Sequence, residues 1–478
     1  MNQPDQSFAL AWNQFLTRIL PFADVASADL PLKRLLRLSL FQLSVGMAVV
    51  LLNGTLNRVL VVEMHVPAWL VGLMVSLPLL VAPLRALIGH RSDYHHSAFG
   101  LRRVPYIWLG TLLQFGGFAI MPFALLLLAD NANRMQVLGQ GFSALAFLLV
   151  GAGMHTVQTA GLALATDLAP EDTRPRVVAM LYVMLLAGMV CCGLLFGKLL
   201  ENFDNGKLIA LLQGAAVVTI VFNLIALWKQ EAVDPKRAAT PEARPNFRET
   251  WADFMSGGRS GRLLLAVGLG AAGFTMQDIL LEPFGGQILH QSVAQTTWLT
   301  AILAGGNLLA FALVARQMGR GGEPHRVATL GVLIGIIAFS LVIAADALDS
   351  AWVFRSGTAL IGFGNGLFSV GTLIAAMAMA EREHRGLALG AWGAVQATAA
   401  GTAVGISGAM KDLVTGLATH HGSFGLAIGA PSLGYGSVYC LEILLLLATL
   451  PVILPLALRP AARLAGGESR IGLTQIPG

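Results

Sequence analysis

Long apolar runs, separated by short polar connections, make up most of this 478-residue chain. Runs of about 20 residues are long enough to cross the hydrocarbon core of a bilayer as α-helices. Twelve such runs predict transmembrane helices at about 38–62, 67–88, 104–128, 139–165, 177–200, 208–228, 263–284, 297–318, 327–347, 353–379, 387–409 and 438–458. The expected fold class is therefore an all-α membrane protein with twelve transmembrane helices.

The composition and the distribution of charge support this prediction. Hydrophobic residues make up 55% of the chain and charged residues only 12%, against about 25% charged residues in ordinary soluble domains. The connections on one side of the predicted helices hold 25 Lys and Arg residues, and those on the other side hold five. Basic connections stay in the cytoplasm, so both termini are expected there. The net charge of +5 follows from this bias and indicates no nucleic-acid partner.

An internal repeat divides the chain. GAG at 151–153 aligns with GFG at 362–364 at an offset of 211 residues, which makes the predicted helices around them equivalent. A connection rich in Pro, Ala and charge is typical of a linker between the two halves. We expect an amphipathic cytoplasmic segment at 1–37, six-helix halves at 38–228 and 263–458, a cytoplasmic linker at 229–262 and a cytoplasmic tail at 459–478. This organisation resembles the major facilitator superfamily.

Carboxylates interrupt the seventh apolar run. The stretch AGFTMQDILLEPFGG, residues 272–286, contains Gln277, Asp278 and Glu282. If the stretch is one α-helix, Asp278 and Glu282 project from the same face, because they are four residues apart. An ionised carboxylate near the centre of a bilayer costs about 2.5 to 3.5 kcal/mol on insertion scales. Both side chains are therefore expected to face the protein interior and to have partners there.

A basic residue in the first apolar run is the candidate partner. Asn57 and Arg58 in GTLNRVLVVE align with Gln277 and Asp278 at a constant offset of 220 residues. Inverted or parallel repeats bring equivalent positions together near the centre of a transporter fold, which predicts an ion pair between Arg58 and Asp278. The pair could act in binding or in conformational coupling, or it could only hold two helices together.

The connection after the second run has a second pattern. It reads GHRSDYHHSAFGLRRVPY and contains Gly89, Asp93, Arg102 and Arg103. The pattern resembles the signature loop of the major facilitator superfamily, although YHHSAF is inserted before the second glycine. Asp93 could accept hydrogen bonds from basic groups and helix-terminal amides, and so latch the halves on the cytoplasmic side. The alternative is a solvated basic turn that only fixes orientation.

Five longer stretches carry a more specific resemblance. They are GTLNRVLVVEMHVPAWLVG at 54–72, PLRALIGHRSD at 83–93, LRRVPYIWLGTLLQFGG at 101–117, DLAPEDTRPRVVAMLYVMLLAGMV at 167–190 and QDILLEPFGG at 277–286. Together they closely resemble the PucC/LhaA family, the bacteriochlorophyll-delivery branch of the superfamily. The resemblance implies an assembly factor for the light-harvesting antenna in the inner or intracytoplasmic membrane of purple phototrophic bacteria. The partners it implies are antenna polypeptides or the reaction centre–antenna complex, bacteriochlorophyll synthase, the membrane insertion machinery and membrane lipid.

A bacteriochlorophyll would need an apolar groove, either between the halves or on the lipid-facing side, and an axial ligand for its magnesium. His155 is the deepest histidine in the predicted helices, and Gln158 lies three residues on, on roughly the same face. His155 and Gln158 are thus the candidate pigment-binding residues. A hydrogen-bonded histidine within the helix bundle is the alternative.

Three functions remain open on sequence alone. The first is a pigment-carrying assembly factor, the second a proton-coupled secondary transporter in which Asp278 and Glu282 titrate, and the third a pigment-free scaffold for antenna assembly. An enzyme is not expected, because the chain contains no phosphate loop, nucleophile elbow or metal-spaced cluster.

Overall fold

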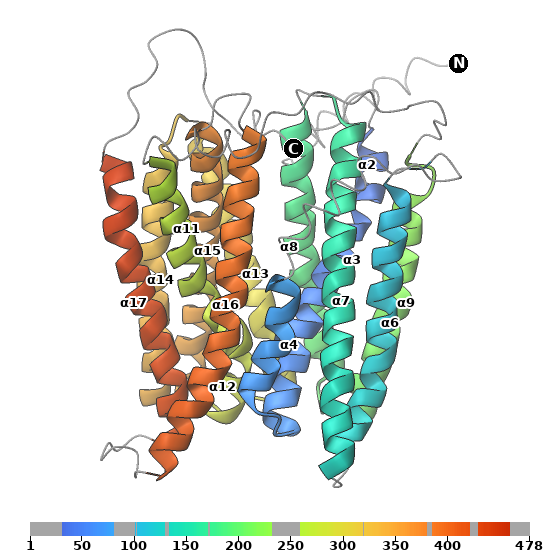
Figure 1. Cartoon of the computed structure of the whole chain (residues 1–478), viewed down its shortest axis with the longest axis vertical. Coiled ribbons are helices and arrows are strands. Elements are labelled where there is room, and N and C mark those ends of the chain that lie inside the picture. The colour runs from blue at the N-terminus through green and yellow to red at the C-terminus, as the bar shows by residue number, and fades with distance from the viewer. Residues whose placement is uncertain are drawn as a thin grey trace, which may run out of the picture.

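The computed structural model describes residues 31–80, 101, 103–129, 133–170, 173–231, 259–318, 320–379, 385–420 and 429–458. The described part is helical, and its long helices run roughly parallel to one another (Figure 1). The elements are α2 Leu32–Leu38, α3 Leu40–Val49, η2 Val50–Leu56, η3 Val59–Glu63, α4 Ala68–Leu80, α6 Val104–Leu128, α7 Asn133–Leu168, α8 Arg174–Leu199, α9 Asn205–Leu227, α11 Arg259–Thr275, η5 Met276–Ile279, α12 Leu281–Gln287, α13 Val293–Met318, α14 Pro324–Ala347, α15 Ala351–Met379, α16 Arg385–His420 and α17 Ala430–Leu458.

Ten helices in the described part are long and apolar enough to cross a membrane. They confirm a multi-pass, all-α membrane protein. The first of them is continuous from Leu32 to Glu63 and joins α2, α3, η2 and η3, while the sixth joins α11, η5 and α12. The expected second helix corresponds to α4, which is described only to Leu80, and the expected eleventh corresponds to α16. The count of twelve stays a prediction.

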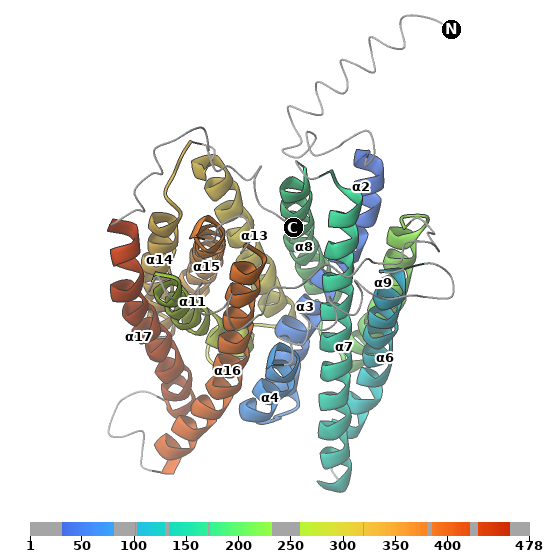
Figure 2. The same ribbon diagram turned by 45° about the horizontal axis from the view of Figure 1, so that its top comes forward.

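The helices form two groups that lie side by side (Figures 1 and 2). One group runs from α2 to α9 and the other from α11 to α17. The groups meet where α4 packs along α16 and where α8 packs along α13. The residues that would connect the groups, 232–258, lie outside the described part, as do most of the predicted linker and the tail at 459–478.

The GAG and GFG patterns mark equivalent close contacts in the two groups. A Cβ atom on Gly153 of α7 would lie 2.6 Å from the backbone nitrogen of Gln114 on α6. In the other group, a Cβ atom on Gly364 of α15 would lie 2.8 Å from the carbonyl oxygen of Gly331 on α14. Only glycine permits this approach of two helix backbones. The repeat predicted from these two patterns therefore has a packing reason.

Two of the transmembrane helices are irregular at aligned positions. The first contains the π-helical segments η2 and η3, and the seventh predicted span contains the 3₁₀ segment η5 followed by the new helix α12. Pro283 is consistent with the second break, because a proline has no N–H donor and its ring clashes with the carbonyl four residues earlier, here that of Ile279 at the end of η5. Pro283 lies in the first turn of α12, where proline is tolerated. The stretch 272–286 is therefore not one continuous α-helix, and the condition for Asp278 and Glu282 to share a helix face is not met.

Candidate functional site

The break in the seventh span is stabilised by a carboxyl group from α17. The backbone N–H of Gln277 donates a hydrogen bond of 2.7 Å to Oε1 of Glu442. In an uninterrupted α-helix this N–H would donate to the carbonyl four residues earlier. A freed backbone group at membrane depth must find another partner. Glu442, which is 0% exposed, is that partner.

Glu282 lies against the other group of helices. Its side chain is buried, and Oε1 accepts a hydrogen bond of 2.9 Å from the hydroxyl of Thr300 on α13. A Cβ atom on Gly54 of η2 would lie 3.7 Å from the same carboxylate oxygen and would also overlap the Thr300 hydroxyl. Glu282 therefore lies where the first, seventh and eighth predicted helices meet.

Asp278 is half-buried on η5. Its Oδ1 accepts a hydrogen bond from the side chain of Gln277. Its backbone carbonyl is 3.5 Å from Nδ2 of Asn57, which also donates to the carbonyl of Asn53 at 2.9 Å. The aligned stretches around Asn57 and Gln277 are thus in contact, as the offset of 220 residues predicts. Because η5 is a 3₁₀ segment, Asp278 and Glu282 do not lie on the face of a single α-helix.

The predicted ion pair between Arg58 and Asp278 is wrong. Arg58 is 4% exposed, and it pairs through Nη1 with Oε1 of Glu63, which is 39% exposed in its side chain. Its Nη2 donates to the backbone carbonyl of Gln291 at 3.1 Å. Residues five apart face each other across a π-helical turn, as in η3, and not across an α-helical one. The π-helix therefore directs the Arg58 guanidinium to Glu63 and not to Asp278.

Glu442 and Tyr439 are site residues that the sequence analysis missed. Glu442 is the only carboxylate in the 29-residue helix α17, in the run VYCLEILLLL. The same argument that singled out Asp278, a charge inside an apolar run, would have found it. Tyr439 lies three residues earlier on the same helix face. Its hydroxyl is buried and has no hydrogen-bond partner among the described residues.

An aromatic cluster closes the site on the side of α17. The ring of Phe284, two residues after Glu282, packs edge-on against both Tyr435 and Tyr439, with ring centroids 5.5 Å apart in each case. The Tyr435 hydroxyl donates to Oε1 of Gln287 at 2.8 Å. The ammonium group of Lys411 lies 5.2 Å from the centre of the Tyr435 ring, at cation–π distance. These rings exclude water from the carboxyl groups.

The latch residues fall mostly outside the described part. The part of the chain that the structure describes does not include Gly89, Asp93 and Arg102, so the latch stays a prediction. Arg103 is buried at the start of α6 and donates through Nε to Oδ2 of Asp167 on α7 at 3.0 Å. The backbone N–H groups of Arg103 and Val104 donate to the carboxylate of Glu231. A carboxylate therefore accepts from the amides at the start of α6, but it is the carboxylate of Glu231 and not that of Asp93.

The candidate pigment ligands lie on α7. His155 is 8% exposed and Gln158 is half-buried. Nothing in the described structure tests His155 and Gln158 as pigment ligands, so this role stays a prediction.

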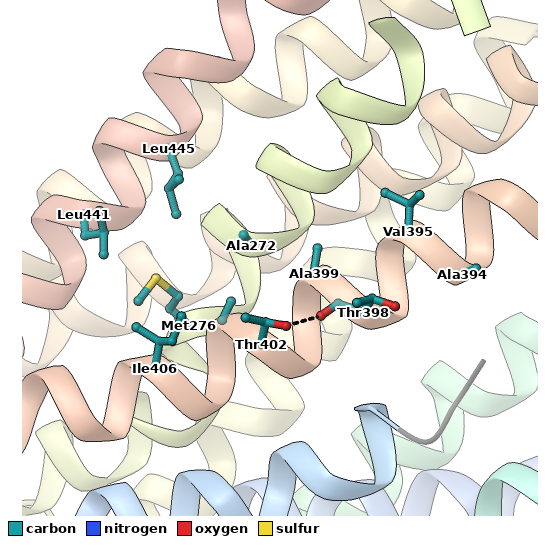
Figure 3. Close-up of a pocket in the computed structure, with 11 residues that line it drawn as sticks. Ala272, Met276, Ala394, Val395, Thr398, Ala399, Thr402, Ile406, Leu441 and Leu445 are labelled. Carbon is teal, nitrogen blue, oxygen red and sulfur yellow. Dashed lines mark hydrogen bonds between the residues drawn. The ribbon is translucent and has the colours of Figure 1, made fainter. Parts of the chain in front are cut away.

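An apolar groove of about 690 Å³ lies elsewhere, between α11, α16 and α17 (Figure 3). Its volume is within the usual range for small-molecule sites, about 300–1,000 Å³. Its walls are lined by the small or apolar side chains Ala272, Met276, Ala394, Val395, Thr398, Ala399, Thr402, Ala403, Ile406, Leu441 and Leu445. The Thr402 hydroxyl donates to the carbonyl of Thr398. The groove fits the apolar face of a tetrapyrrole or its tail, but it contains no imidazole or carboxamide for magnesium.

Three carboxyl groups, those of Asp278, Glu282 and Glu442, lie at the break in the seventh span. In the described ranges, no three His, Cys, Asp or Glu side chains come together in a group that could hold a metal ion. Asp278, Glu282 and Glu442 form no ion pair with any described Lys, Arg or His. The residues can hold protons and can link the break in the seventh span to the first and eighth helices.

Known proteins resemble the chain over most of its length. A family model described as PUCC protein matches residues 55–461. Protein PucC of Rhodovulum sulfidophilum is 57% identical over 403 residues, which cover 83% of this chain and 89% of that protein. The uncharacterized protein in the puhA-bchM intergenic region of Rhodobacter capsulatus is 50% identical over 477 residues and 98% of each chain.

Solved structures resemble the fold. A bacterial homolog of the human lysosomal transporter Spinster, in an inward-facing and unoccupied conformation, matches with a TM-score of 0.65 and 14% identity. The match covers 88% of this chain and 95% of that chain. Identity at this level shows the fold alone. The fold is that of the major facilitator transporters.

Proposed function

Since the chain belongs to the PUCC protein family, we propose that it is an assembly factor for the bacterial light-harvesting antenna. The single observation that carries the proposal is the family match over residues 55–461, and the 57% identity to a protein PucC supports it. The protein would act in the inner or intracytoplasmic membrane. Its partners would be antenna polypeptides or the reaction centre–antenna complex, with bacteriochlorophyll synthase and the membrane insertion machinery nearby.

The proposed ligand of the protein is bacteriochlorophyll, bound non-covalently. When bound, it would supply the light-absorbing group that the antenna polypeptides receive, with no covalent chemistry on the assembly factor. The groove between α11, α16 and α17 would hold the apolar part of the pigment, because small side chains such as Ala399 and Thr398 let a flat ring approach the helix closely. The groove offers no axial ligand for magnesium, so a partner polypeptide would have to supply one if the pigment binds there.

The test is to purify the protein in mild detergent from phototrophically grown cells and to measure its absorption spectrum and its subunit content. Pigment at a fixed ratio, together with antenna polypeptides, is expected. Antenna polypeptides without pigment would favour the scaffold function. If the purified protein carries neither pigment nor antenna polypeptides, that result would contradict the assembly function and would favour transport. The transporter fold is the observation that supports transport. Uptake that depends on a proton gradient and on Asp278 would then be the next measurement.

Two variants on one helix test the groove. Ala399→Phe would fill it, since Ala399 is one of its lining residues. Leu413→Phe is the matched control, because Leu413 lies on the same helix and is 64% exposed. Ala399→Phe is expected to lose bound pigment and to keep the antenna polypeptides, whereas the control keeps both. Equal pigment in both variants would contradict the groove as the binding site.

A further inference from the structure

One oxygen of Glu442 has no partner in the described structure. Its Oε1 accepts from the backbone N–H of Gln277, but Oε2 is buried and unpaired. A carboxylate oxygen that is negatively charged needs hydrogen-bond donors or a cation, since an isolated buried charge is very costly. No described Lys, Arg or His forms an ion pair with Glu442. A proton on Oε2 would remove the charge.

The surroundings of Glu442 add negative rather than positive charge. Asp278 lies close enough to interact electrostatically with both Glu442 and Glu282. Arg58 is occupied by Glu63 and the Gln291 carbonyl, and Lys411 by Asp412 at 3.2 Å and the Tyr435 ring. Three carboxyl groups that share a water-poor region without a cation cannot all be ionised.

Tyr439 is a second buried polar group without a partner at this place. Its hydroxyl is fully buried, has no partner among the described residues, and interacts electrostatically with the carboxyl groups of Glu442 and Glu282. A hydroxyl can accept a hydrogen bond as well as donate one. Since neither the hydroxyl nor Oε2 has a hydrogen-bond partner, the two are not bonded to each other, and one water molecule between them could accept from a protonated Oε2 and donate to the hydroxyl.

We propose that Glu442 is the centre of a proton-binding site, formed with Tyr439, Asp278 and Glu282, that holds a proton within the membrane. Release of this proton requires a new donor for Oε2, and so requires rearrangement at the break in the seventh span. That break touches the first helix through Asn57 and the eighth through Thr300. Proton binding is therefore coupled to the contact between the two groups of helices, whether the protein carries pigment or a solute.

The test is infrared spectroscopy of the purified full-length protein at neutral pH, in H₂O and in D₂O. The wild-type protein is expected to show the carbonyl stretch of a protonated carboxyl group, with a shift in D₂O. Glu442→Gln should remove this band, and its amide oxygen can still accept from Gln277. Glu201→Gln is the matched control, because Glu201 is an exposed carboxylate between α8 and α9, and this variant should keep the band.

An unchanged band in folded Glu442→Gln would overturn the proposal. If that variant does not fold, Tyr439→Phe takes its place, because it removes the hydroxyl and keeps the ring packed on Phe284. The Tyr439→Phe variant is expected to shift the carbonyl band of the protonated carboxyl group, and an unshifted band would overturn the proposal. The measurement needs neither pigment nor antenna polypeptides, so its failure is distinguishable from failure of the proposed assembly function.

Discussion

The guanidinium group of Arg58 lies beside Gly286, so that a Cβ atom on this glycine would be 3.0 Å from Arg58 Nε. The contact joins the first helix to α12, in the stretch LLEPFGG. Glu63 and the carbonyl of Gln291 hold the guanidinium in place from other directions. The close approach of Arg58 therefore explains why glycine, which has no Cβ atom, fits at position 286.

Gly286→Ala is predicted to destabilise the protein. The added methyl group would displace a guanidinium that has two fixed partners, and overpacking of this kind costs about 1–3 kcal/mol. The measurement is the thermal unfolding midpoint in detergent. Gly436→Ala on α17 is the control, because a Cβ atom there meets nothing within 4 Å, and Ala in place of a helical Gly stabilises by about 0.5–1 kcal/mol. Equal midpoints in the two variants would contradict the contact.

Arg58 is predicted to be coupled energetically to Glu63 and not to Asp278. Residues in direct contact show interaction energies of roughly 0.5–3 kcal/mol in double-mutant cycles, whereas separate residues add. The interaction energy between Arg58 and Glu63 should be near the low end of this range, because the Glu63 side chain is half-exposed. The two cycles are Arg58→Gln with Glu63→Gln, and Arg58→Gln with Asp278→Asn, both followed by thermal unfolding. Coupling in the second cycle alone would restore the pair that the repeat suggested.

The sequence predicts the long elements well because their cause is local. Twenty apolar residues must form a helix in a bilayer wherever they lie in the fold, and the GAG and GFG patterns mark helix contacts that only glycine permits. The aligned stretches around Asn57 and Gln277 also meet as predicted.

The partners of the charged residues could not be predicted in the same way. Whether Arg58 faces Glu63 or Asp278 depends on the π-helical turn of η3, and no local residue pattern specifies that turn. The role of Glu442 depends on the break at η5, which places the Gln277 N–H toward α17. Pro283 signals the break in the sequence, but it does not say which distant side chain will satisfy the freed amide.

Glu442→Leu is predicted to be far more harmful than Glu442→Gln. Leucine would leave the buried N–H of Gln277 without a partner, which costs about 1–3 kcal/mol, whereas glutamine keeps an acceptor at the same place. The measurement is the amount of folded protein recovered in detergent and its thermal unfolding midpoint. If the leucine variant were as stable as the glutamine variant, the hydrogen bond at the break would not matter.

The start of α14 is predicted to weaken in acid. Glu323 caps this helix by accepting from the backbone N–H of Arg326 at 3.0 Å, and a second oxygen contacts Nδ1 of His325 at 2.7 Å. Partial burial alone would raise the pKa of Glu323, but the hydrogen bond and charge of His325 and the bond from Arg326 lower it below its ordinary value of 4.5.

Proton linkage gives the direction in which stability depends on pH. Between the lowered pKa of folded Glu323 and the ordinary value, the unfolded chain binds more protons than the folded one, so stability rises with pH across that window. The contribution is complete above about pH 4.5 and is lost as the pH falls through the folded pKa. Thermal unfolding midpoints from about pH 6 down to about pH 3.5 should therefore fall less steeply in Glu323→Gln than in the wild-type protein. Glu201→Gln, which changes an exposed carboxylate, should follow the wild-type profile, and parallel profiles for all three proteins would show that Glu323 has no such role.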